Sequence, residues 1–187
     1  KYQSLLVAMR QEIFNEESGI IYRFDEIVLE RVLGTTRRGE GNRDNIPLIK
    51  MGDIFGGNIK IGDNERIQNG EDLNALLLQR GDILFNTRNT PALVGKTAIY
   101  NSELSCTYDN NLMRIRVVPS VDSWYLNHLM NSPQFLQSLS RITAGTTSVA
   151  AIYWNDLRRL KISLPSIARQ RQSAKSIESI LAVISNL

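Results

Sequence analysis

The sequence predicts an α+β fold in which a strand-rich domain is followed by a long C-terminal helix. Short apolar runs separated by turns rich in glycine and asparagine occupy residues 20–118, a pattern typical of strands. After Pro165 the apolar residues instead recur at heptad positions, a pattern typical of a helix that packs against another helix. These two patterns place the strands before the long helix in the chain.

The composition indicates an intracellular globular protein. The chain has 187 residues, 42% of them hydrophobic, enough for one domain with an extension. Its single cysteine, Cys106, excludes an internal disulfide and a cysteine-based zinc site, which favours a reducing cytoplasm. No apolar run reaches the roughly 20 residues that span a bilayer, so we expect no membrane association. The first residue is Lys1 rather than Met, which suggests a fragment.

The charge is distributed unevenly. The net charge is +3, but residues 141–187 contain seven Lys and Arg against Asp156 and Glu178. That segment therefore has a net charge of +5, and residues 1–140 are slightly acidic. A basic C-terminal quarter is compatible with a nucleic-acid partner, although it does not require one.

The first third of the chain predicts a helix, short strands and a loop. Residues 3–16 have the spacing of an amphipathic helix, which Ser18-Gly19 ends. Residues 20–33 predict short strands. Residues 34–45 contain three arginines and no apolar residue, so we expect an exposed loop.

The middle of the chain predicts further strands. Residues 46–51 and 54–61 form two of them, with a hairpin turn or bulge at Gly56-Gly57. Residues 83–85 and 95–100 form two more. Residues 112–118 alternate between apolar residues and Arg114 and Arg116, which predicts a strand with one face exposed.

Three elements complete the predicted fold. Ser123 is the expected N-cap of a helix over residues 124–139, which Ser132-Pro133 kinks or divides. Residues 160–164 predict a strand that Pro165 ends. We divide the chain into an N-terminal helix (1–17), a strand-rich domain (18–165) and a helix for pairing (166–187). The expected pairing residues are Ile167, Ala174, Ile177, Leu181 and Ile184.

The sequence lacks the usual motifs of catalysis or of a metal site. Gly95-Lys96-Thr97 resembles the end of a phosphate-binding loop, but position 90 is Thr rather than the required Gly. His128 is the only histidine, so a histidine-based zinc site is excluded, and its apolar neighbours favour a structural role over pairing with Cys106. The prolines are never adjacent, which excludes the proline-containing tetrapeptide of amino-methyltransferases. We predict no catalytic residues.

Three polar segments have the residue types that contact nucleic acid. The loop at 34–45 combines arginines with hydroxyls and amides, and residues 86–89 (NTRN) repeat this combination after a strand. Residues 145–148 (GTTS) offer hydroxyls beside a glycine. Each segment alone is also what a solvated loop contains, so together they favour DNA or RNA without deciding between them.

Three stretches form an ordered set: IPLIKMGDI at 46–54, GDILFNTR at 81–88 followed by VGKTAI at 94–99, and Gly145-Thr146-Thr147 followed by a Leu164-Pro165 end and Gln170. These stretches resemble the target recognition domains of type I restriction-modification specificity subunits. Together they cover most of residues 25–172 in the family's order. The resemblance implies a non-catalytic module that recognises one half of a bipartite DNA target, while long antiparallel helices set the spacing.

The resemblance also implies partners and cofactors. The partners are double-stranded DNA, a methyltransferase subunit, a restriction and translocation subunit, and a second recognition domain or second copy through the terminal helices. S-adenosylmethionine, ATP and Mg are expected in those subunits, with no cofactor in this chain. The start of the chain resembles the end of a spacer helix, which suggests the second domain of a longer chain. We expect DNA contacts from Thr36, Arg37, Arg38, Arg43, Asn86, Arg88, Asn89, Lys96, Thr146 and Thr147.

Two other interpretations stay open at this point. One alternative is the C-terminal recognition domain of a fused restriction-methyltransferase polypeptide. The chain is also compatible with a protein-interaction module whose terminal helix only assembles a complex.

Overall fold

A six-stranded sheet is the centre of the computed structural model, which describes residues 2–16, 18–39, 42, 45–146 and 148–185. Neighbouring strands are antiparallel except for β5 and β9, which are parallel. The strands, in spatial order, are β2 (Val28–Leu33), β11 (Leu112–Val117), β7 (Ile83–Asn86), β9 (Thr97–Ile99), β5 (Asn58–Ile59) and β4 (Ile54–Phe55). Gly56 and Gly57 join the last two with φ of 61° and 94°, so the predicted hairpin turn is confirmed.

Helices cover one face of this sheet. Ile83, Phe85, Met113 and Ile115 point to that face and pack against α2 (Ser123–Met130) and α3 (Pro133–Ser140). Division of the predicted helix at Ser132-Pro133 is confirmed. The N-cap is Asp122 rather than Ser123, because the Asp122 carboxylate accepts a hydrogen bond from Tyr125 N at 2.9 Å.

A small second layer covers the other face. It consists of β3 (Ile46–Ile49), β6 (Arg66–Ile67) and β10 (Thr107–Tyr108), together with the short helices η2 (Met51–Asp53) and η3 (Glu71–Leu76). Leu84, Tyr108 and Leu112 are buried between this layer and the sheet. The prediction that the face of Arg114 is exposed is therefore wrong, since Arg114 is 1% exposed. An alternating pattern indicates two different faces but not that the polar face meets water.

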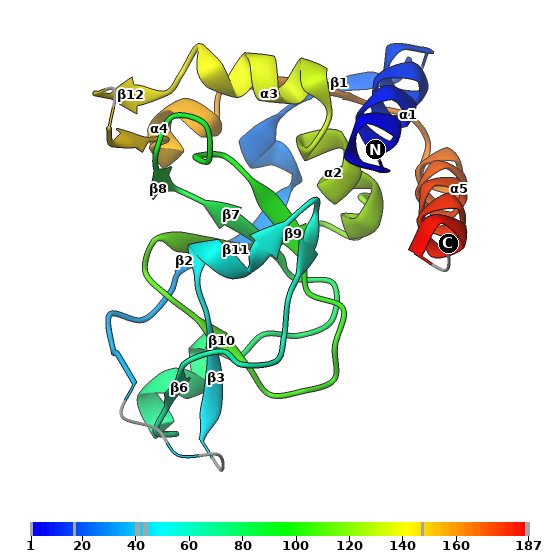
Figure 1. The fold of residues 1–187 in the computed structure, drawn as a ribbon. Helices are drawn as coiled ribbons and strands as arrows, with labels where there is room; N and C mark the ends of the chain where they lie inside the picture. Colours follow the sequence, from blue (N-terminus) through cyan, green and yellow to red (C-terminus); the bar gives the residue numbers. More distant parts are fainter. Residues whose placement is uncertain (1, 17, 40–41, 43–44, 147, 186–187) are drawn as a thin grey trace.

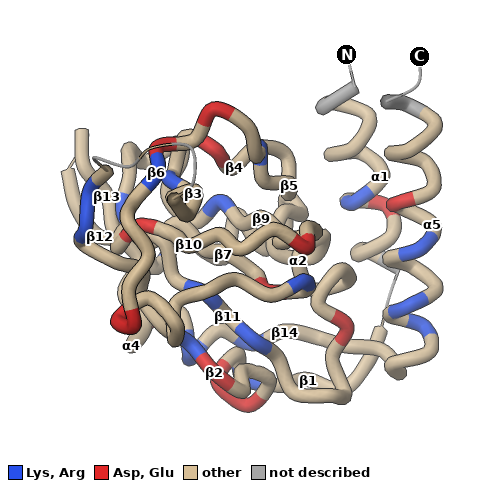
Figure 2. Tube along the Cα trace, turned by 90° about the horizontal axis from the view of Figure 1, so that it is seen from below, with Lys and Arg blue, Asp and Glu red and all other residues tan. Residues whose placement is uncertain are grey.

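The terminal helices lie side by side at one end of the molecule. In Figure 2, α1 (Tyr2–Glu16) and α5 (Ile167–Ser185) are adjacent, and both chain ends lie at the same end of the pair, so the helices run in opposite directions. Both also pack on α2. A ribbon of β1 (Ile20–Arg23) and β14 (Lys161–Leu164) connects the helices to the domain, with η1 (Phe24–Ile27) following β1. In the described part of the chain, no helix has the length and apolar character needed to cross a membrane.

A third sheet lies at the opposite end. It contains β8 (Arg88–Asn89), β13 (Ala150–Ala151) and β12 (Ala144–Gly145), and the short helix α4 (Trp154–Leu157) follows it. Figure 1 shows β8, β12 and α4 on the far side of the molecule from α1 and α5. The fold therefore has a helical end and a loop-rich end, separated by the central sheet.

Candidate nucleic-acid interface

Two of the three predicted polar segments become neighbours in the third sheet. Arg88 of β8 pairs with Ala151 of β13, and Ala150 of β13 pairs with both Asn89 and Gly145 of β12. Residues that are about 57 positions apart in the sequence are thereby two strands apart. The structure therefore brings Arg88 and Asn89 of one predicted segment and Gly145 of another into one small sheet.

A cleft of about 300 Å³ lies beside this sheet, and we call it the β8 cleft. It is bounded by the edge strand β2, the turn before β11, and the chain from β13 into α4. Its lining residues are Arg31, Leu33, Thr87, Arg88, Asn110, Asn111, Met113, Ala151, Ile152, Tyr153 and Trp154. The residues at its base, Met113 and Ile152, are each 3% exposed, whereas Leu33 and Tyr153 are 53% and 55% exposed.

Backbone hydrogen bonds fix the walls of the β8 cleft. The Thr87 N–H and hydroxyl both donate to the Asn111 carbonyl, at 2.9 and 2.8 Å. The Ile152 N–H donates to the Thr87 carbonyl at 2.9 Å. Thr87 therefore ties the turn at Asn111 to the chain leaving β13, so the cleft is bounded by bonded backbone rather than by loose loops.

The two arginines of the β8 cleft differ in their contacts. The Arg31 guanidinium lies over the Trp154 ring, 4.5 Å from its centroid, a cation–π contact. Arg88 is exposed, and among the residues that the structure describes it has no hydrogen-bond acceptor, carboxylate or aromatic ring. An exposed guanidinium without a protein acceptor keeps its donors available for a ligand.

The predicted arginine loop joins the same end through Arg38. Its Nη2 donates to Asn110 Oδ1 at 3.1 Å, and its Nη1 donates to the Arg37 carbonyl at 2.9 Å. Arg37 instead pairs with Asp72, at 3.1 Å and 3.2 Å to the two carboxylate oxygens. Thr36 between them is exposed. Arg43 lies outside the described residues.

β12 and β13 pair as a tight antiparallel hairpin. Thr146 N–H donates to the Val149 carbonyl at 2.8 Å, and the hydroxyls of Thr146 and Ser148 are 3.2 Å apart. Gly145 has φ of 136°, and a Cβ there would lie 2.2 Å from the Val149 carbonyl oxygen. Only glycine fits this position, so the hairpin shape depends on it. Thr147 lies outside the described residues.

Two of the predicted DNA contacts are not at this interface. Asn86 is 1% exposed, and its Nδ2 donates to the Leu93 carbonyl at 3.3 Å. The Asn86 amide thus holds a turn in the interior of this structure, and a DNA contact from Asn86 stays a prediction. Lys96 lines a different hollow near α1 and β4, at the opposite edge of the central sheet from β2.

Asn89 is half-buried in β8, and its Oδ1 accepts from Thr90 N at 2.8 Å.

The sequence alone did not identify several residues of the β8 cleft. In β2, Arg31 and Leu33 alternate with Glu30 and Val32, so the two pairs lie on opposite faces of the strand. This alternation is visible in the sequence. Tyr153 and Trp154 lie five and six residues after Ser148, but their residue types were not among those used to predict nucleic-acid contacts. Asn110 gives no such signal, because its place depends on pairing across the sheet.

At the helical end, part of the predicted pairing face is used within the chain. Ala174 and Ile177 are 4% and 0% exposed, and Ile167 and Leu181 are half-buried. α5 meets α1 and α2 here, so these residues already have partner helices in the same molecule. The side chain of Ile184 lies outside the described residues. Pairing of this face with a further helix stays a prediction.

A buried polar chain connects three helices at that end. Arg10 Nη2 of α1 donates to His128 Nδ1 of α2 at 3.1 Å, and His128 Nε2 is 2.7 Å from Glu178 Oε1 of α5. Burial lowers the pKa of Arg10 to about 10, and it also lowers the pKa of His128. Because arginine only donates and carboxylate only accepts, the neutral histidine with its proton on Nε2 satisfies both partners.

Comparisons with known proteins relate the chain to one family, although no family model matches it. A protein of Methanocaldococcus jannaschii, described as the specificity subunit of the type I restriction enzyme MjaX, is 30% identical over 157 residues. That match covers 79% of this chain and 37% of the relative. The chain thus spans well under half the length of this relative.

Solved structures give the same relationship at the level of the fold. A chain from a study of complex assembly in a type I R-M system has a TM-score of 0.67 at 20% identity, covering 99% of this chain and 46% of that one. The HsdS subunit from Thermoanaerobacter tengcongensis has a TM-score of 0.66 at 18% identity, covering 98% and 44%. The type I S subunit from M. genitalium has a TM-score of 0.61 at 9% identity, covering 99% and 50%. By sequence and by fold, the chain is thus a relative of the specificity subunits of type I restriction enzymes.

Proposed function

We propose that this chain recognises one half of a bipartite DNA target as part of a type I restriction-modification specificity subunit. In this proposal the chain performs no chemistry. It positions the complex on DNA, and a methyltransferase subunit then methylates adenine while a separate subunit translocates and cleaves unmethylated DNA. S-adenosylmethionine, ATP and Mg would be bound by those subunits.

The observation that carries the proposal is the unpaired Arg88 at the rim of the β8 cleft. The Arg88 guanidinium is exposed and has no acceptor among the described residues, so its donors are available to a ligand. Around it, within the same cleft, are a second guanidinium, two asparagine amides and an exposed tyrosine. Guanidinium groups bind phosphates and guanine edges, and amides bind base edges, so this combination suits duplex DNA.

The position of the cleft also supports the proposal. β8 and α4, which line the β8 cleft, lie on the far side of the molecule from α1 and α5 (Figure 1). Contacts made through the helices would therefore leave the cleft free to approach DNA. The relationship to type I specificity subunits supports the same assignment, and the two solved HsdS and S subunits are about twice as long as this chain.

Selection of bound DNA from a random pool tests the proposal. The complete subunit that contains this chain is assembled with its methyltransferase subunit, and the bound fragments are sequenced and footprinted. We expect one shared half-site for this domain. A change of Arg31 and Arg88 together to alanine should abolish its enrichment, whereas Lys60→Ala, an exposed cation beside β5, should leave it intact. Fragments without any shared half-site would contradict DNA recognition by this chain.

A further inference from the structure

We infer that Arg88 and Asn110 together recognise a guanine at the mouth of the β8 cleft. This inference rests on the proposed function and names one base and two specificity-determining residues. It depends on which side-chain hydrogen-bond donors in the cleft are held in position without an acceptor among the described residues.

Arg88 is fixed at its backbone and free at its tip. It lies in β8, whose register with β13 places it opposite Ala151. The neighbouring Thr87 is held by three hydrogen bonds of 2.8–2.9 Å. Near the cleft, Arg37 pairs with Asp72, Arg38 bonds Asn110, and the face of the Arg31 guanidinium lies on Trp154. Arg88 is therefore the arginine of the described cleft lining whose guanidinium is positioned without being used.

Asn110 supplies a second donor, and Arg38 sets its orientation. Arg38 only donates hydrogen bonds, so the Asn110 atom 3.1 Å from Arg38 Nη2 must be the carbonyl oxygen Oδ1. The Asn110 amide nitrogen then points elsewhere, and it has no acceptor among the residues that the structure describes. Arg38 is in turn held by the Arg37 carbonyl at 2.9 Å. Arg38 thus acts as a positioning residue for Asn110.

Two side-chain donors that line the same cleft match one base better than the others. In the major groove guanine presents two acceptors, O6 and N7, and an arginine binds both at once. Adenine presents an acceptor beside a donor, and cytosine presents a donor, so each would oppose a donor with a donor. Thymine presents one acceptor and a methyl group. A phosphate would also accept from both residues, but it would give no sequence preference.

The test uses base analogues in the complete subunit assembled with its methyltransferase subunit. The selected half-site is synthesised with 7-deazaguanine, which lacks the N7 acceptor, at each guanine in turn. We expect the wild-type complex to bind about 10-fold more weakly at one of these positions. Arg88→Ala should bind the parent site about 10- to 100-fold more weakly and should be insensitive to the analogue there.

Arg88→Lys and Lys60→Ala make the test specific. Lysine keeps the charge but loses the fork of donors, so Arg88→Lys should retain affinity for random DNA and lose the preference for guanine. Asn110→Asp replaces a donor with an acceptor and should weaken binding to the half-site at the same guanine position. Arg38→Ala should reproduce a milder form of the Asn110 defect. Lys60→Ala should behave as wild type.

The outcomes separate this inference from the proposed function. A half-site without a guanine, or one at which every guanine tolerates the analogue, would overturn the inference while leaving DNA recognition in place. Arg88→Ala weakening all sequences equally would do the same, because it would make Arg88 a phosphate contact. Failure to select any half-site would instead contradict the proposed function.

Discussion

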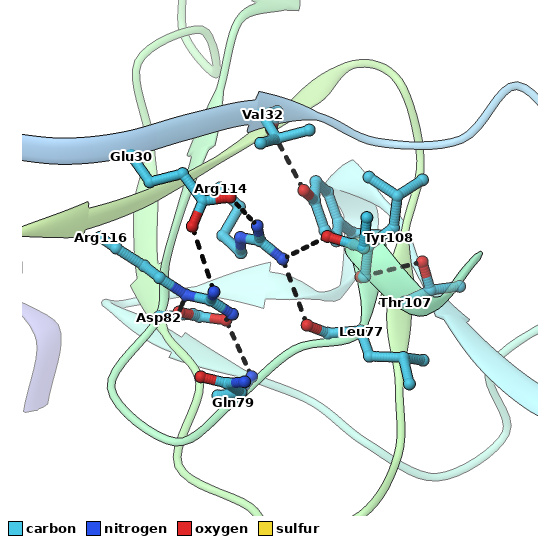
Figure 3. A network of polar contacts seen from close by, with 11 residues as sticks. Glu30, Val32, Leu77, Gln79, Asp82, Thr107, Tyr108, Arg114 and Arg116 are labelled. Carbon is cyan, nitrogen blue, oxygen red and sulfur yellow. Dashed lines mark hydrogen bonds and ion pairs between the residues drawn. The ribbon is translucent and has the colours of Figure 1, made fainter. Parts of the chain in front are cut away.

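The two faces of the strand pair β2–β11 use arginine in opposite ways. On one face, Arg114 and Arg116 are joined to Glu30 and Asp82 in a network that is partly or fully buried (Figure 3). On the other face, Arg31 and Leu33 line the β8 cleft, where Arg88 has no acceptor among the described residues. The difference distinguishes arginines that stabilise the fold from one that is available to a ligand.

The network connects the two layers of the domain. Arg114 donates to Glu30 at 2.6 Å and to the carbonyls of Ala75 and Leu77 at 3.0 and 3.2 Å. Arg116 forms a fork to Asp82, with contacts of 2.6 and 3.1 Å, and this hydrogen bonding raises the pKa of Arg116. These bonds link β2, β11 and the segment before β7 to the chain that follows η3. The guanidinium groups here replace apolar packing between the sheet and the second layer.

Breaking the network should have the largest effect on stability. We expect Arg114→Met to lower the free energy of unfolding by about 3 kcal/mol, because the buried guanidinium is lost and the carbonyls of Ala75 and Leu77 and the Glu30 carboxylate lose their donor. Urea unfolding followed by circular dichroism measures the change. Arg31→Met, the same substitution on the opposite face of the strand pair, should cost only about 0.5–1 kcal/mol through the lost Trp154 contact. Equal losses for the two variants would contradict the contrast between the faces.

The sequence predicts these strands well but not what covers them. The alternation at 112–118 correctly separates Met113 and Ile115 from Arg114 and Arg116, because side chains alternate along any strand. It cannot show that β3, β6 and β10 cover the arginine face, because that layer is assembled from residues up to about 70 positions away. Arg114 was therefore expected in solvent, and it is buried.

For the candidate interface, too, the sequence predicts the polar segments but not how they come together. Arg88 and the 145–148 hairpin are visible as polar segments, since their residue types are unusual between strands. Their pairing through β13 and the inclusion of Asn110 depend on strand register, which local sequence does not specify. Asn86 has the same residue type as Asn110 but faces the interior. Composition alone does not separate them.

On the cleft side, backbone shape should matter more for stability than charge. We expect Gly145→Ala to lower the free energy of unfolding by about 2 kcal/mol, because φ is 136° and the new methyl would meet the Val149 carbonyl oxygen at 2.2 Å. Gly52→Ala is the matched control, since nothing lies within 4 Å of a Cβ there and its φ is not positive. Thermal unfolding of both variants measures the difference. A Gly145→Ala protein as stable as Gly52→Ala would show that the hairpin relaxes freely.

At the helical end, His128 is paired with Arg10 and Glu178, and the stability of the fold should depend on pH because of His128. Burial is the main cause that lowers the pKa of His128, with Arg10 also lowering it, while Glu178 and Asp122 raise it. Between the lowered folded pKa and the ordinary value near 6.5, the unfolded chain binds more protons than the folded chain. Stability is therefore complete above about pH 6.5 and should fall as the pH drops below it.

His128→Gln tests that pH dependence. At pH 7.5 we expect the variant to lose about 1 kcal/mol, because glutamine cannot reproduce both bonds to Arg10 and Glu178. Between pH 7.5 and 5.5 the variant should lose less stability than the wild type does, since it has no group to protonate at this place. Urea unfolding at both pH values measures the two slopes. Parallel slopes would mean that His128 does not cause the acid sensitivity.

The smallest expected change in stability belongs to Arg88, the residue on which the proposed recognition depends most. Arg88→Met should alter the free energy of unfolding by less than about 0.5 kcal/mol, because the guanidinium is exposed and has no acceptor among the described residues to lose. Arg37→Met, which breaks an exposed pair with Asp72, is the control and should cost a similarly small amount.

The small change in stability expected for Arg88→Met is what distinguishes Arg88 from Arg114. A buried arginine that stabilises the fold costs about 3 kcal/mol to remove, so a loss above about 1 kcal/mol for Arg88→Met would assign Arg88 to the same class. Arg88 would then stabilise the cleft instead of being available to bind DNA. If the loss stays below 0.5 kcal/mol while specific DNA binding falls about 10-fold or more, the energetic role of Arg88 lies in the complex and not in the fold.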